Sequence, residues 1–164
     1  MNELLQNLTE ALREELKEYG EMLALLDQQQ QMVTNRQTQD LLQSVAGINL
    51  QAEAIAAARL EREQRQREVA RELKLPADAA FTEVLPRVPL PFQPLVQALV
   101  QENNQLLARI QYRARQNHLL LSRAVELMQR FLGSLFPGNP TTYDNAGQLL
   151  ASALPPRTVY DAIG

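Results

Sequence analysis

Proline placement divides this sequence of 164 residues more sharply than any other feature. The nine prolines fall between residues 76 and 94 and between residues 137 and 156, so residues 1–75 and 95–136 contain none. Proline inside a helix removes a backbone hydrogen bond and clashes with the preceding turn. The proline-free stretches are rich in Leu, Ala, Gln, Glu and Arg, which are strong helix formers. The sequence therefore predicts long helices.

Apolar residues recur at three- and four-residue steps along three segments, as they do in amphipathic helices. We predict helices over residues 2–31, 39–75 and 92–136, with a Pro-rich connector at 76–91 that contains one helical turn. The last segment, 137–164, is rich in Pro, Gly, Asn and Thr and is predicted to be a flexible tail. Helices of similar length favour an all-α fold, an elongated antiparallel three-helix bundle or coiled coil formed by residues 1–136.

Charge favours the pairing of the first and third helices. Residues 1–27 carry two basic and seven acidic side chains, whereas residues 92–136 carry five basic and two acidic side chains. Opposite net charge helps to select neighbours, although each exposed ion pair contributes little free energy. We therefore expect the first helix to lie beside the third.

Composition argues against most chemical functions. The net charge is −3 without a basic stripe, so no nucleic-acid partner is expected. The chain has no Cys, and His118 is its single histidine, without a second ligand at metal spacing. No phosphate-binding loop or acid–base pair is present, so we expect no enzyme, no metal and no cofactor. The N-terminus does not resemble a signal peptide and no run of 18 apolar residues occurs, so we expect a cytoplasmic chain without membrane insertion.

The C-terminal half of the third helix is the candidate site, because it carries an unusually apolar run, LLLSRAVELMQRFLGSLF. One face of that run is formed by Leu121, Val125, Met128, Leu132 and Leu135, with Phe131 and Phe136 beside it. Two interpretations remain open at this point. The face completes the core of the bundle, or it extends beyond a shorter first helix and binds a partner helix.

The order of these segments resembles the FlgN-type flagellar export chaperones. The resemblance covers roughly residues 3–147: an acidic N-terminal helix, a second helix beginning DLLQSV, and the run QNHLLLSRAVELMQRFLGSLF followed by TTYDNAG. An Asn-x-x-Asn-x-x-Leu element leads into the last helix of that family, and a Tyr-x-x-x-Gly element follows it. Asn117, Leu120, Tyr143 and Gly147 match these elements, whereas Ala114 departs from them.

The resemblance implies a chaperone that binds the hook-associated proteins FlgK and FlgL, prevents their premature assembly and passes them to the export gate and its ATPase. The C-terminal helix of the chaperone is the part associated with substrate binding, so we expect FlgK or FlgL to dock its own C-terminal helix there. Our candidate substrate-binding residues are Asn117, Leu120, Leu121, Val125, Met128, Phe131, Leu132, Leu135, Phe136 and Tyr143.

Two other functions stay open from the sequence. One is a structural coiled-coil adaptor or dimerisation rod, for which the apolar repeat alone is sufficient. The other is a chaperone of a different secreted substrate. The sequence also leaves open whether the chain is a monomer or a homodimer.

Overall fold

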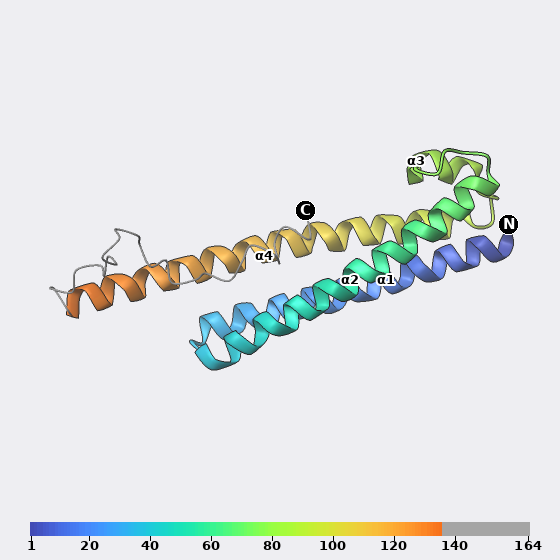
Figure 1. Cartoon of the computed structure of the whole chain (residues 1–164). Coiled ribbons are helices and arrows are strands. Elements are labelled where there is room, and N and C mark those ends of the chain that lie inside the picture. The colour runs from blue at the N-terminus through green and yellow to red at the C-terminus, as the bar shows by residue number, and fades with distance from the viewer. Residues whose placement is uncertain (136–164) are drawn as a thin grey trace, which may run out of the picture.

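The computed structural model describes residues 1–135, so the tail predicted at 137–164 lies outside the described residues. Three long helices carry the fold: α1 (Asn2–Thr34), α2 (Thr38–Glu72) and α4 (Gln93–Leu135). A connector between α2 and α4 holds the short α3 (Phe81–Val84) and a 3-10 turn, η1 (Leu85–Arg87). No strand occurs in residues 1–135. The predicted all-α fold, an elongated bundle of three long helices, is confirmed (Figure 1).

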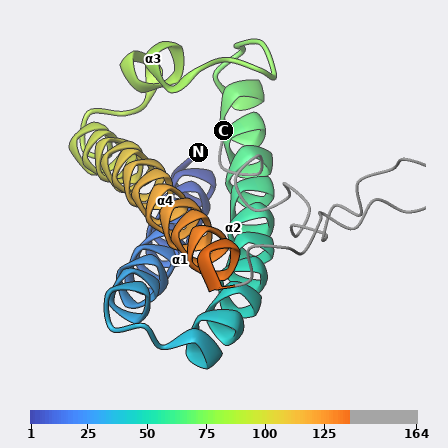
Figure 2. The same cartoon turned by 90° about the vertical axis from the view of Figure 1, so that its left-hand side faces the viewer.

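The first helix lies against both of the others. Hydrogen bonds from α1 to α2 join residues 15, 33 and 47 positions apart, an increasing separation that shows the two helices to be antiparallel. The bonds from the side chains of Asn103 and Asn117 on α4 to backbone oxygens of α1 both join residues 91 positions apart, which shows that α1 and α4 run parallel. Figure 2 shows the three long helices around a shared interior.

The interior consists of two apolar clusters stacked along the bundle. The first lies at the connector end and joins α1, α2 and α4 to the connector; its buried members are Leu5, Leu8, Leu12, Val69, Ala70, Ala79, Val84, Val88, Val96 and Leu99. The second lies toward the α1–α2 turn, with Tyr19, Met22, Leu23, Leu26, Ile48, Ile55, Ile110 and Ala114. The core is thus built from aliphatic side chains along one face of each long helix, as the periodicity predicts.

Two residues with left-handed backbones end the first two helices. Arg36 has φ 57° and Lys74 has φ 58°. In each case the backbone N–H of the following residue donates to a carbonyl five residues back, so the last turn of the helix is closed by a hydrogen-bonded cap. The second helix therefore ends at Glu72, three residues before the predicted end at 75. Proline alone located the break at Pro76, whereas Lys74 stops the helix earlier.

The connector is a packed part of the bundle. Ala79, Val84 and Val88 are buried in the first cluster, and the Gln66 side chain of α2 donates to the backbone oxygen of Ala79 over 2.8 Å. The helical turn predicted within the connector is present as α3. These contacts fix the path from the end of α2 to the start of α4, which lie at the same end of the bundle (Figure 1).

A buried ion pair joins α1 to α2 between the apolar clusters. Glu15 is 3% exposed, and its carboxylate accepts one hydrogen bond from Arg62 Nε at 3.1 Å and another from the Tyr19 hydroxyl at 3.0 Å. Burial raises the pKa of Tyr19 above its usual value near 10, and the adjacent Glu15 carboxylate raises it further. The three side chains form one connected polar group between the two apolar clusters.

Removing one member of that group should destabilise the bundle. In Arg62→Ala the Glu15 carboxylate stays buried without its cation, and we expect the free energy of unfolding to fall by roughly 3 kcal/mol. Arg67→Ala is the matched control, because the Arg67–Glu63 pair on the same helix is exposed and worth less than about 1 kcal/mol. Urea unfolding of both variants measures the difference. Equal losses of unfolding free energy in the two variants would contradict the dependence of the buried Glu15 on Arg62.

Tyr19 should also make the stability depend on pH in alkaline solution. In the unfolded chain a tyrosine ionises near pH 10, whereas the raised pKa keeps Tyr19 protonated in the folded chain. The unfolded state then loses the proton first, so the free energy of unfolding should fall as pH rises above about 10. Tyr19→Phe should make that fall shallower, and Tyr112→Phe, at an exposed position, should not. Identical pH profiles for the two variants would refute this.

Candidate partner-binding surface

The C-terminal part of α4 extends beyond the helix that covers the rest of it. Asn103 donates to the backbone oxygen of Leu12, and Asn117 to that of Leu26, both at a separation of 91 residues. The same separation places Thr34, the last residue of α1, beside Val125. Residues 126–135 therefore lie beyond α1, over about 15 Å. Figure 1 shows this end of α4 extending past the α1–α2 turn. We call residues 119–135, which begin beside the last turns of α1 and run past its end, the projecting segment.

Apolar side chains on the projecting segment are open to solvent. The exposed fraction is 48% for Val125, 60% for Met128 and 49% for Leu132. On the neighbouring side of the helix it is 65% for Leu127 and 59% for Phe131. Exposed apolar residues that occur singly need no explanation, but a contiguous group of them marks an interaction surface.

One exposed row continues the core face of α4. Upstream, α4 buries Val96, Leu99, Asn103, Ile110, Ala114 and Asn117. Further steps of three and four residues lead to Leu121, Val125, Met128 and Leu132, which we call the continuing stripe. Leu121 is half-buried near the end of α1 and the other three are exposed. The same helix face is therefore core where α1 covers it and surface where α1 has ended.

The ten predicted site residues differ in how far the structure exposes them to solvent. Four are exposed on the projecting segment: Val125, Met128, Phe131 and Leu132. Leu120 and Leu121 are half-buried at its base. Leu135 is the last residue of α4, but its side chain is outside the described part of the chain, as are Phe136 and Tyr143.

Asn117 lies in the interior instead of on this surface. It is fully buried, and its amide Nδ2 donates to the Leu26 oxygen at 2.7 Å and to Gln29 Oε1 at 3.0 Å. Its contacts are thus with α1 of its own chain, because it stands on the core face before α1 ends. Asn103 repeats this arrangement two heptads earlier, and neither Oδ1 has a hydrogen-bond partner.

Sequence reasoning missed a second exposed row beside the first. Leu120, Ala124, Leu127 and Phe131 follow one another at steps of four, three and four residues, and we call them the lateral stripe. Of these, the prediction included Leu120 and Phe131 but neither Ala124 nor Leu127. The available signal was the spacing of these residues, which lie beside the core face of α4.

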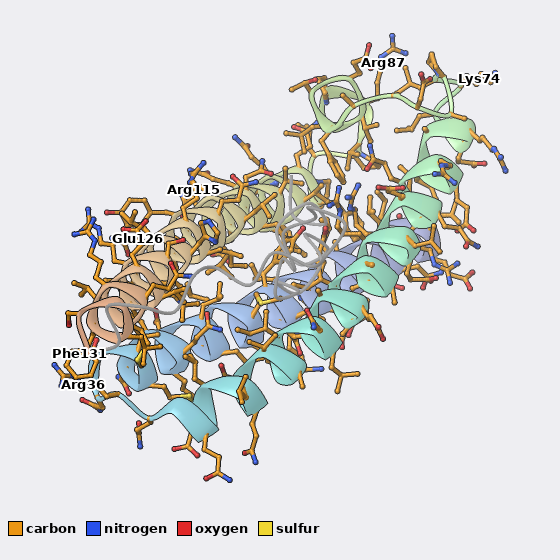
Figure 3. All side chains as sticks on the ribbon, turned by 60° about the vertical axis from the view of Figure 1, so that its left-hand side comes forward. Arg36, Lys74, Arg87, Arg115, Glu126 and Phe131 are labelled. Atoms are coloured by element: carbon orange, nitrogen blue, oxygen red, sulfur yellow. The ribbon has the colours of Figure 1, made fainter. Side chains whose placement is uncertain are left out.

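A narrow charged face bounds the two stripes. Arg123, Glu126 and Arg130 lie on the other side of the projecting segment, where all three are exposed. Figure 3 labels Glu126 and Phe131 on this end of α4. Nearer the middle of the helix, Arg113 forms an ion pair with Asp27 of α1 at 2.6 Å, which realises the predicted attraction between the first and third helices.

Other features of the described residues are weaker candidates for a functional site. A shallow groove of about 440 Å³ lies between the connector and α4, lined by Phe81, Thr82, Leu85, Gln97, Val100, Gln101, Asn104, Gln105 and Ala108. Among residues 1–135 no group of His, Asp and Glu side chains is arranged to hold a metal ion. In the same residues, no helix is long and apolar enough to cross a membrane.

Comparison with known proteins agrees with the resemblance read from the sequence. The model of one protein family, described as FlgN protein, matches residues 1–151. The chain belongs to the FlgN family. Membership in the FlgN family assigns it, in general terms, the role of a flagellar export chaperone for hook-associated proteins. Neither the comparison with curated proteins nor the comparison with solved structures finds a match.

The projecting segment of this FlgN-family chain should tolerate polar substitution without unfolding. Met128→Gln with Leu132→Gln changes side chains that are already about half exposed, so we expect the melting temperature to shift by less than about 3 °C. Ile110→Ala is the matched control on the same helix face, fully buried by α1, and should cost roughly 2–5 kcal/mol. Thermal melts followed by circular dichroism test both. A Met128/Leu132 variant as unstable as Ile110→Ala would place the continuing stripe in a core.

Proposed function

We propose that the chain is a cytoplasmic chaperone of flagellar type III export that holds FlgK- and FlgL-like hook-associated proteins through the projecting segment of α4. It keeps them from assembling early and delivers them to the export gate and its ATPase. The observation that carries the proposal is the passage of one helix face from core to surface where α1 ends. Family membership supplies the class of partner.

The geometry supports a partner helix as the bound element. Along residues 96–117, α1 runs parallel to α4 and covers its apolar face. A partner helix laid on the continuing stripe would take the same place relative to α4, in line with α1. Burial of a Val, Leu or Met side chain contributes about 1.5–3 kcal/mol, or about half of that for a side chain already half buried.

The proposed action needs no catalysis. Masking a helical terminus removes the surface through which subunits would assemble, and it requires only a complementary apolar face. The partner is released when another binding event competes for that face. We therefore propose a binding protein that uses neither a cofactor nor a reaction step.

Substitution on the continuing stripe should abolish partner binding. Met128→Gln with Leu132→Gln should weaken the affinity for purified FlgK and FlgL by at least 100-fold, because both side chains leave the buried interface. Arg123→Gln with Arg130→Gln is the matched control on the charged face and should change the affinity less than threefold. Isothermal titration calorimetry measures both.

Two outcomes would contradict the proposal. Failure of the unmodified protein to bind either FlgK or FlgL would remove the substrate assignment. Unchanged affinity in the folded Met128/Leu132 variant would remove the continuing stripe from the interface. Sedimentation of the free protein, measured alongside, distinguishes a chaperone monomer from the homodimer expected of a dimerisation rod.

A further inference from the structure

The side of α4 that carries the lateral stripe, which we call its flank, changes from mostly charged to apolar residues near the end of α1. On the side that carries the lateral stripe, the equivalent earlier positions are Glu102, Leu106, Arg109 and Arg113; Leu106 is half-buried against the second cluster, and the other three are charged. Seven residues after Arg113 the row becomes apolar, and Leu120, Ala124, Leu127 and Phe131 follow. Charge is replaced by apolar surface over the same part of the helix in which the core face becomes exposed.

The upstream part of α4 shows how much one neighbouring helix covers. There α1 buries the core face, while three of the four flank positions are charged: Glu102 and Arg109 are exposed, and Arg113, about one-third exposed, pairs with Asp27. In this part of α4 the buried core face is thus bordered by the half-buried Leu106, and the rest of the flank is charged. In a soluble chain, an apolar flank at 120–131 is explained by a second element that covers it.

The centres of the two stripes lie roughly 100° apart around the helix, at 3.6 residues per turn. A single helix contacts an apolar band about 100° wide. The continuing and lateral stripes together span about 160°, with Leu120 and Leu127 at one edge and Val125 at the other. That width suits two helices packed side by side better than it suits one.

We propose that the projecting segment binds a helical pair: two amphipathic helices of one partner chain, packed against each other and against α4. One lies on the continuing stripe in line with α1, and the other lies on the lateral stripe. The result is a local three-helix bundle that extends the bundle of the free chain. This inference rests on the proposed function, because the exported subunit supplies both helices.

Continuity with the existing interface identifies the first position, since the continuing stripe is the α1-binding face prolonged. The charged face of Arg123, Glu126 and Arg130 remains in water in such a complex. Both apolar stripes are then buried, and no charged side chain of the projecting segment is buried with them. This is the pattern expected at the core of a stable helix interface.

The test compares two probes on two variants. The probes are the full-length FlgK- or FlgL-like subunit and a synthetic peptide of its C-terminal helix alone. Leu127→Gln with Phe131→Gln changes the lateral stripe, at positions that are 65% and 59% exposed, so folding is preserved. We expect this variant to bind the full-length subunit at least tenfold more weakly and to bind the peptide within threefold of the unmodified protein.

Met128→Gln with Leu132→Gln should instead weaken the binding of both probes. Affinity for the full-length subunit that is unchanged in the Leu127/Phe131 variant would overturn the helical pair and leave the proposed function intact. Equal loss for subunit and peptide would also overturn it, because one helix would then cover both stripes. A free protein that is dimeric, and becomes monomeric in the Leu127/Phe131 variant, would assign the lateral stripe to a second copy. Absence of binding by the unmodified protein would instead defeat the proposed function.

Discussion

Two buried asparagines set the position of α4 along α1, and the rest of the architecture depends on that register. Asn103 and Asn117 reach backbone oxygens of Leu12 and Leu26, so the two pairs repeat at the same spacing. Aliphatic faces alone permit helices to slide by a heptad, because each layer resembles the next. Backbone oxygens recur along α1, so the register is specified by side-chain partners. Asn117 also donates to Gln29 Oε1 and Arg113 pairs with Asp27, and a slip would lose both contacts.

The register in turn determines which part of α4 is exposed. With residue 117 fixed beside residue 26, the first helix ends at Thr34, and no other helix among residues 1–135 covers the last ten residues of α4. The cap at Arg36 turns the chain back into α2, so α1 cannot extend further. A surface for a partner thus arises from a difference in helix length, held in place by polar contacts in the core.

Much of the fold followed from the sequence, because proline and apolar periodicity act locally. The breaks after 34 and before 93 lie within a few residues of their predicted places, and the first helix does lie beside the third. The end of α2 could not be predicted from the sequence, because a lysine gives no indication of the left-handed backbone conformation that Lys74 adopts. The Glu15–Arg62 pair was equally hidden: both residues belong to charged runs typical of exposed helix surfaces.

The candidate surface was predictable in outline only. Residues 125, 128 and 132 share a face by spacing alone, but the same spacing is found in a core. The choice between the two depends on where the neighbouring helix ends relative to α4, which is a property of tertiary packing. Asn117 illustrates the limit, because its place in a family motif gave no indication that it binds α1. The lateral stripe is recognised only by comparison with the mostly charged positions on the same side of α4 where α1 covers the helix.

Hydrogen exchange, followed amide by amide in the free chain and in its complex with a hook-associated protein, tests the central claim most directly. Amides at 96–117 should be protected in both states, because α1 covers that part of α4. Amides at 123–134 should exchange rapidly in the free chain, where local opening disrupts few contacts, and slow by at least tenfold in the complex. Strong protection of 123–134 in the free chain, or slowing confined to the connector groove, would contradict the account.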